Sequence, residues 1–213
     1  METLSFSRIS AFKNKLIGIK STYTPEMSEK GRRVQREVIT SISNRNFPQA
    51  LSRHLSEYSL FSAGNDSRAI RVSNGDDGWK HELSASPDLF ASDKEDRIHL
   101  WLEIKMRGYE IPEDHVQSTL AYLVGEKRYS TSDLFGNGGD FKYFFYYAGS
   151  QSVVEVKSPG DREREAVNSL CWVVVQMLAD EKHEKLASPE KLKMLYENFE
   201  VLTGRGEQPV IGL

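Results

Sequence analysis

Asp88, Glu103 and Lys105 have side chains suited to metal and acid–base chemistry, and they lie close together in the sequence. Asp88 follows Pro87, and Glu103-Ile104-Lys105 begins after fourteen intervening residues. Carboxylates are the protein ligands that Mg²⁺ prefers, and a nearby ammonium group can orient a water molecule and balance negative charge. A cation with such a neighbour is what hydrolysis of a phosphodiester by direct attack of water requires. The residue types therefore predict a centre for phosphodiester hydrolysis.

Apolar residues occupy every second position of residues 98–107, which is typical of a β-strand and determines the face from which each side chain projects. Glu103 and Lys105 are two residues apart, so on a strand they project from one face, which also carries His99 and Trp101. The other face is apolar throughout: Leu100, Leu102, Ile104 and Met106. We expect the apolar face to be buried in the core and the charged face to lie outside it.

A hairpin would bring the two acids together. The strand-like segments His81–Ala91 and Ile98–Arg107 flank the polar turn Asp93–Asp96. If the turn centres between residues 95 and 96, Asp88 lies directly across from Glu103, with Cβ atoms about 5 Å apart. Two carboxylates at that separation repel each other unless a cation lies between them. The register thus predicts a Mg²⁺ or Mn²⁺ site.

A second acid pair has the same spacing. Asp140 and Glu155-Val156-Lys157 repeat the pattern, and the triplet alone has little weight because Asp180-Glu181-Lys182 also has it. If segments 141–147 and 152–157 form a hairpin that turns near Gly149, Glu155 pairs near Phe144 and Asp140 near residue 159. The offset of four residues is about 13 Å, which one cation does not bridge. We therefore favour the first pair.

The conjunction of Ser86-Pro87-Asp88 with Glu103-Ile104-Lys105 resembles the signature of the PD-(D/E)XK nuclease superfamily. The resemblance implies a restriction-endonuclease-like fold, Mg²⁺ (or Mn²⁺) bound by Asp88 and Glu103, and Lys105 beside the attacking water. It also makes Glu37 the candidate for a helix acid that supports the metal, and Gln117 the candidate for positioning the substrate. Members related to recombination exonucleases place a tyrosine four residues after this glutamine, whereas here Tyr122 follows five residues after Gln117.

The order of elements indicates an α/β (α+β) domain with a central mixed β-sheet flanked by helices. Helices are expected from Thr24-Pro25, after Phe47-Pro48, from Pro112, from Asp161 and from Ser188-Pro189. Further strands are expected at 69–72, 141–147 and 152–157, with turn clusters at 64–66, 74–78 and 136–139. We expect residues 1–213 to form a single nuclease-like domain with its core at about 24–180 and a C-terminal helical extension at about 188–204.

Composition places limits on partners and location. The net charge of −3 argues against a protein that coats nucleic acid through bulk electrostatics, although it allows an enzyme that acts on it. Arg32, Arg33 and Arg36 are candidates for phosphate contacts or for a solvated helix face. Residues 1–15 lack an apolar leader and Cys171 is the single cysteine, so we expect an intracellular protein, cytoplasmic or nuclear, that is not secreted and not membrane-bound.

Together these features predict a metal-dependent nuclease whose partner is nucleic acid, DNA rather than RNA. Two alternatives stay open. One is a catalytically inactive module on the same fold that binds nucleic acid or protein, for which no metal dependence is expected. The other is an unrelated α/β domain in which Asp88 and Lys105 form a surface ion pair.

Overall fold

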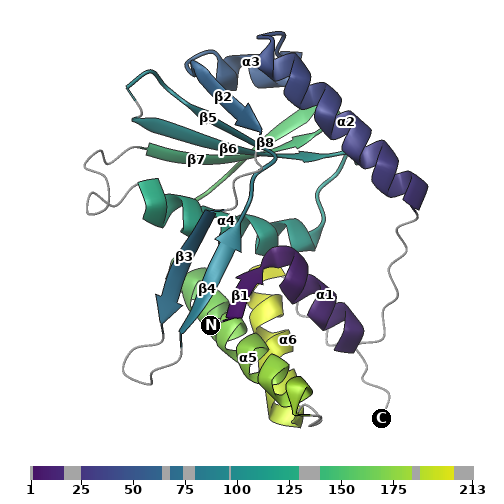
Figure 1. The fold of residues 1–213 in the computed structure, drawn as a ribbon, viewed down its shortest axis with the longest axis vertical. Coiled ribbons are helices and arrows are strands. Elements are labelled where there is room, and N and C mark those ends of the chain that lie inside the picture. The colour runs from purple at the N-terminus through teal and green to yellow at the C-terminus, as the bar shows by residue number, and fades with distance from the viewer. Residues whose placement is uncertain are drawn as a thin grey trace.

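The computed structural model describes residues 2–16, 25–63, 68–73, 80–95, 97–129, 140–183 and 188–203. These residues form two sheets and six helices (Figure 1). The strands are β1 (Glu2–Ser5), β2 (Leu60–Ala63), β3 (Arg68–Ser73), β4 (Lys80–Ala85), β5 (Leu89–Ser92), β6 (Ile98–Lys105), β7 (Asp140–Tyr147) and β8 (Ser152–Val156). The helices are α1 (Phe6–Leu16), α2 (Pro25–Ser43), α3 (Gln49–Leu55), α4 (Pro112–Tyr129), α5 (Asp161–Lys182) and α6 (Pro189–Thr203). The expected mixed sheet flanked by helices is confirmed.

The larger sheet has the order β2-β5-β6-β7-β8 and places β6 at its centre. β6 pairs antiparallel with β5 and parallel with β7, and β8 returns antiparallel to β7. Figure 1 shows α2 and α3 on one face of this sheet and α4 on the other. The parallel step from β6 to β7 is possible because α4 makes the crossover between them.

Both faces of β6 are buried, so the expectation that its charged face lies outside the core is wrong. Leu100, Leu102 and Ile104 pack with residues of α2 and α3, as expected for the apolar face. Trp101, on the other face, is 0% exposed and belongs to the cluster that includes residues of α4. A central strand covered by helices on both sides has no solvated face. Glu103 is consequently only 9% exposed and must find its partners within the protein.

The predicted strand His81–Ala91 is wrong in one respect, because it is two strands in two different sheets. β4 ends at Ala85 and pairs with β1 and β3 in the smaller sheet, whereas β5 begins at Leu89 in the larger one. The break falls at Ser86-Pro87-Asp88, where proline lacks the N–H that a continuous ladder needs. The chain therefore crosses between the sheets at Asp88.

The first residues of the chain supply two elements that the sequence pattern did not predict. β1 pairs parallel with β4 in the register Leu4↔Leu83, and α1 follows it directly. Leu4, Ile9 and Phe12 are buried in the same cluster as α4, α5 and α6. Leu195, Phe199 and Leu202 of α6 are buried there as well. The core thus extends on both sides of the expected range of 24–180.

The other predicted elements are observed close to their expected positions, and β2 is a further strand that was not predicted. The turn clusters at 64–66, 74–78 and 136–139 lie outside the described residues. None of the helices that the structure describes combines the length and the apolar character needed to cross a bilayer.

Candidate active site

Asp88 lies directly beside β6 at the position that the hairpin register predicts. β5 and β6 pair as Leu89↔Leu102 through Ser92↔His99, so one further step places Asp88 opposite Glu103. The Asp88 side chain extends this ladder, because its Oδ2 accepts a hydrogen bond from the backbone N–H of Ile104 at 2.7 Å. The predicted register is confirmed.

The electrostatic environment of Asp88 disfavours its charged form. Burial raises the pKa of Asp88 most, and the neighbouring Glu103 carboxylate raises it further; together they outweigh the Ile104 N–H and the Lys105 ammonium and bring it to about 7. Asp88 therefore holds its proton to a higher pH than an ordinary aspartate does. A cation bound between Asp88 and Glu103 would reduce the repulsion between the two carboxylates.

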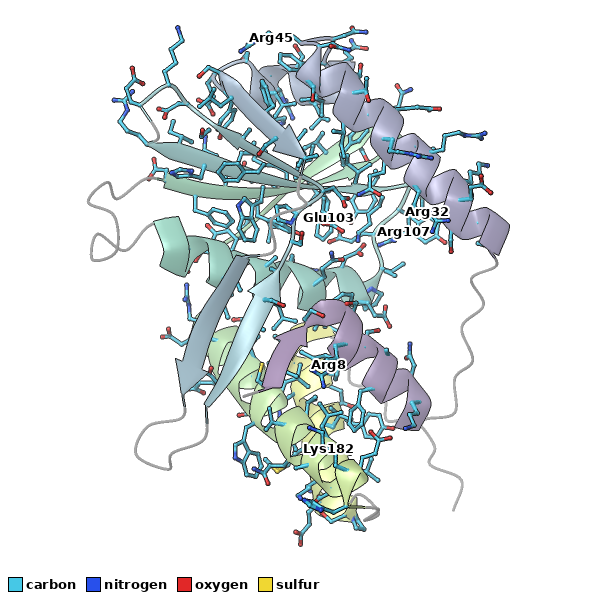
Figure 2. All side chains as sticks on the ribbon, in the orientation of Figure 1. Arg8, Arg32, Arg45, Glu103, Arg107 and Lys182 are labelled. Carbon is cyan, nitrogen blue, oxygen red and sulfur yellow. The ribbon has the colours of Figure 1, made fainter. Side chains whose placement is uncertain are left out.

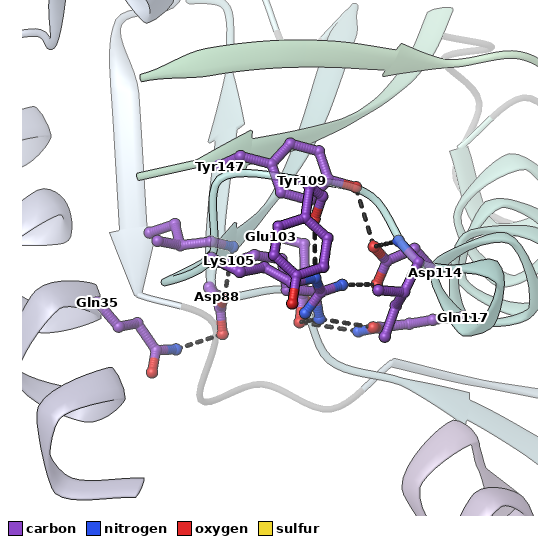
Figure 3. Close-up of polar contacts among 11 residues, drawn as sticks. Gln35, Asp88, Glu103, Lys105, Tyr109, Asp114, Gln117 and Tyr147 are labelled. Atoms are coloured by element: carbon purple, nitrogen blue, oxygen red, sulfur yellow. Dashed lines mark hydrogen bonds and ion pairs between the residues drawn. The ribbon is translucent and has the colours of Figure 1, made fainter. Parts of the chain in front are cut away.

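Glu103, Lys105 and Gln117 form a closed triangle of hydrogen bonds (Figure 3). Lys105 Nζ donates to Glu103 Oε1 at 3.0 Å and to Gln117 Oε1 at 2.7 Å. Gln117 Nε2 donates to the same Glu103 oxygen at 2.8 Å. The two partners fix the orientation of the Gln117 amide, since only its oxygen can accept from an ammonium and only its nitrogen can donate to a carboxylate. Gln117 thus holds the acid and the ammonium in a single arrangement.

The helix α2 reaches the site through Gln35, whereas Glu37 points away from it. Gln35 Nε2 donates to Asp88 Oδ1, as Figure 3 shows. Glu37 is 69% exposed and its Oε1 lies 4.0 Å from Arg33 Nε. Residues two apart on a helix are separated by about 200° around the axis, so both cannot face the sheet. The structure therefore does not bring Glu37 to the site.

The sequence contained the signal for Gln35. Val38, Ile39 and Ile42 pack against the sheet from α2, and they follow Gln35 by three, four and seven residues. These are the spacings of one helix face, so the buried stripe continues to Gln35. The resemblance implied an acid on this helix and so pointed to Glu37, whereas this stripe leads to the amide of Gln35.

A second polar cluster, centred on Asp114, fixes the start of α4 and was not predicted. Asp114 is 3% exposed, and it accepts hydrogen bonds from the Ile111 N–H at 3.1 Å, from the Tyr147 hydroxyl at 3.0 Å and from Arg107. Arg107 lies two residues after the end of β6, and Tyr147 ends β7. The cluster therefore ties the first turn of α4 to two strands. Gln117 lies three residues after Asp114, so this connection also places Gln117 over Glu103.

A cleft of about 170 Å³ opens beside Glu103 and Gln117. The first residues of α1, Phe6 and Ser7, form one wall, and the wall at the crossover includes Ser86. Tyr143 also lines the cleft, and burial together with the Glu103 and Asp88 carboxylates holds its pKa well above the ordinary value, so the phenol stays protonated. The cleft gives the site a space with hydroxyl groups at its edge and apolar side chains within it.

The second acid pair does not converge. Phe144 pairs with Glu155 in the β7–β8 hairpin, which is the predicted register, and the same register places Asp140 opposite residue 159. Both acids are exposed. Asp140 and Glu155 therefore serve as a natural comparison: they have the residue types and the spacing of Asp88 and Glu103 without their geometry.

The remaining candidates have structural roles. His99 is 3% exposed and stacks on Phe90, with ring centroids 5.8 Å apart. Tyr122 packs edge-on against Phe141, with ring centroids 5.2 Å apart. Cys171 is buried on α5, and burial raises the pKa of its thiol to about 12, which makes it a poor nucleophile.

The donor set of the site fits a hard divalent cation. Asp88 and Glu103 offer carboxylate oxygens, and neither histidine nor cysteine is present among the polar contacts of the site. Among the residues that the structure describes, no three or more histidine, cysteine or acidic residues gather in one place, so a cation here would have these two carboxylates as its protein side-chain ligands. Mg²⁺ commonly binds in this way and takes its other ligands from water and substrate. A scan against protein-family models and a search of curated protein sequences give no match to the chain.

Proposed function

We propose that this protein is a nuclease that hydrolyses phosphodiester bonds with Mg²⁺ or Mn²⁺ at Asp88 and Glu103. The observation that carries the proposal is the convergence of these two acids at the crossover between the sheets, with Lys105 hydrogen-bonded to one of them. The pKa of Asp88, raised to about 7 by burial and by Glu103, marks a pair that a cation would stabilise. When bound, the cation would polarise the phosphodiester and balance the negative charge that develops on it.

Lys105 has the position to orient the attacking water. An ammonium group has three hydrogens, and in the described residues Glu103 and Gln117 accept two of them. The third can be directed to a water or to a phosphate oxygen. Lys105 Nζ also lies 5.5 Å from the centre of the Phe145 ring, within the range of a cation–π contact. Gln117 keeps the ammonium from swinging away from the carboxylates.

The resemblance of Pro87-Asp88 and Glu103-Ile104-Lys105 to the PD-(D/E)XK nuclease superfamily supports the same assignment and suggests that the larger sheet is a restriction-endonuclease-like core. The resemblance also favours DNA over RNA as the substrate. Gln117 would position substrate indirectly, since its amide holds Glu103 and Lys105 in place.

The test is cleavage by purified protein, with a matched pair of control variants from the same chain. Single- and double-stranded DNA and RNA are incubated with Mg²⁺, Mn²⁺ or EDTA. We expect metal-dependent cleavage of DNA that falls about a hundredfold or more in Asp88→Asn and in Glu103→Gln. Asp140→Asn and Glu155→Gln make the same chemical changes at exposed positions and should leave the rate unchanged. Cleavage that survives in Glu103→Gln, or that EDTA does not stop, would contradict the proposal.

A further inference from the structure

The exposed side of α2 concentrates positive charge in a chain whose net charge is −3. Lys30, Arg32, Arg33 and Arg36 lie within seven residues and are all exposed, and the exposed acids Glu29 and Glu37 flank them. Figure 2 shows this helix along the outer edge of the molecule, with Arg32 in its N-terminal half and Arg45 just beyond its C-terminal end. The helix therefore presents a basic surface away from the sheet that its other side covers.

The C-terminal half of α2 borders a groove of about 480 Å³. Its lining consists of guanidinium, hydroxyl and amide side chains and one carboxylate: Arg33, Arg36, Glu37, Thr40, Ser41, Asn44 and Asn46. The turn that closes the groove is built into the fold, because the Asn46 N–H donates to the Ser41 carbonyl at 2.9 Å and the Ser41 hydroxyl donates to the Asn46 carbonyl at 2.5 Å. Arg45 adopts a left-handed conformation with φ 57° in this turn. The backbone of this turn is thus held by its own hydrogen bonds.

The same helix connects the groove to the candidate active site. Gln35 donates to Asp88 from the buried side of α2, and Arg36 is the next residue on the exposed side. The groove lies on the face of α2 opposite Gln35, so the helix, roughly 10 Å across, separates the groove from Asp88. From Arg36 the groove continues to Asn44, a rise of about 12 Å along the helix. A polymer bound at both the active site and the groove would pass around α2 between them.

We propose that this groove binds the sugar-phosphate backbone of the DNA that the active site cleaves. Guanidinium groups pair with phosphates, and threonine and asparagine side chains donate to phosphate and sugar oxygens. Such contacts position a nucleic acid without reading its bases, so the groove binds DNA regardless of sequence. The inference rests on the proposed nuclease function for the identity of the polymer, but binding is measurable without cleavage.

Glu37 has a different role in this arrangement from that of a metal ligand. It is the acid among the residues that line the groove, and its Oε1 lies 4.0 Å from Arg33 Nε. A carboxylate at this position repels phosphate and competes for Arg33. Glu37→Gln should therefore strengthen DNA binding, whereas removal of a metal ligand would abolish cleavage without this gain. The two roles predict effects in different directions.

The test is binding of fluorescently labelled single- and double-stranded DNA by anisotropy, in EDTA and over a series of KCl concentrations. The double variant Arg33→Gln/Arg36→Gln should raise Kd about tenfold or more near 0.1 M salt and reduce the salt slope by about 2. Arg162→Gln removes an exposed arginine from α5 and should change neither quantity. Glu37→Gln should lower Kd. All these positions are exposed, and equal melting temperatures verify that the variants are folded.

The outcomes separate this inference from the nuclease proposal. Equal Kd values for the double variant and Arg162→Gln, weaker binding by Glu37→Gln, or no DNA binding by the wild-type protein would overturn the groove assignment. If cleavage requires Asp88 but the double variant binds normally, the nuclease proposal stands and the groove assignment fails. If the double variant loses binding but no DNA is cleaved, the groove assignment stands and the nuclease proposal fails.

Discussion

The carboxyl group of Asp88 should make the metal-free protein less stable as the pH rises, and Asp88→Asn should reverse this effect. The pKa of Asp88 is about 7 in the folded protein, against 3.8 for an unperturbed group. At a pH between these two values, Asp88 is mostly ionised in the unfolded chain and mostly protonated in the folded protein. The folded state then binds more protons than the unfolded state, so the free energy of unfolding falls as the pH increases from about 3.8 to about 7.

The magnitude follows from the size of the shift. A rise in the pKa of Asp88 from 3.8 to about 7 is equivalent to about 4 kcal/mol of stability at pH 8, where the group is ionised in both states. At pH 4.5 the pH is only slightly above the pKa of Asp88 in the unfolded chain, so the loss of stability is about 1 kcal/mol. Asparagine resembles the protonated carboxyl and its side-chain oxygen can still accept from the Ile104 N–H. Asp88→Asn should therefore raise the free energy of unfolding by about 3 kcal/mol more at pH 8 than at pH 4.5, whatever its pH-independent cost.

Urea denaturation in EDTA, followed by the fluorescence of buried Trp101, measures this difference. The control variant Glu155→Gln neutralises an exposed acid on β8 and should show nearly the same effect at both pH values. A change in stability for Asp88→Asn that is equal at pH 4.5 and pH 8 would refute the reasoning. So would a variant that is less stable than wild type by a larger amount at pH 8.

Three further results are expected. Mg²⁺ at pH 8, at about one hundred times its Kd, should stabilise the wild-type protein against thermal unfolding by about 3 kcal/mol and should not stabilise Glu103→Gln. Equal stabilisation of both proteins would contradict a metal role for Glu103. Gln117→Glu should lower kcat strongly and change the free energy of unfolding in urea little, because a second carboxylate repels Glu103 and draws Lys105 out of place. An unchanged kcat would show that the Gln117 amide does not organise the site. In urea denaturation, Asp114→Asn should destabilise the protein by about 3 kcal/mol, because it breaks the buried ion pair with Arg107. Tyr147→Phe should destabilise it by only about 1 kcal/mol, because it removes one neutral hydrogen-bond donor. The reverse order would be inconsistent with the observed contacts.

The geometry of the candidate site was predictable where it depends on local periodicity. The polar turn at 93–96 set the register that places Asp88 opposite Glu103, and a turn near Gly149 set the register that separates Asp140 from Glu155. Antiparallel hairpins follow this arithmetic because each residue of one strand has a fixed partner on the other. The alternation of β6 likewise predicted which side chains share a face.

The features that depend on distant parts of the chain were not predictable in the same way. The pairing of β1 with β4 joins residues about eighty positions apart, and no local pattern near Leu4 indicates it. The coverage of β6 on both faces also depends on helices elsewhere in the sequence, so the burial of Glu103 was missed. The role given to Glu37 failed for a chemical reason, because the resemblance implied an acid on this helix, whereas the helix face brings the amide of Gln35 to Asp88.

Binding of Mn²⁺ at pH 8, followed by the electron paramagnetic resonance signal of the free ion, tests the central claim most directly. Wild type, Asp140→Asn and Glu155→Gln should each bind one Mn²⁺ ion with the same affinity, while Asp88→Asn and Glu103→Gln should each lose the site. Binding by wild type should also weaken steeply below pH 7, as Asp88 takes up its proton. Equal Mn²⁺ binding by wild type and by the Asp88→Asn and Glu103→Gln variants would contradict the account.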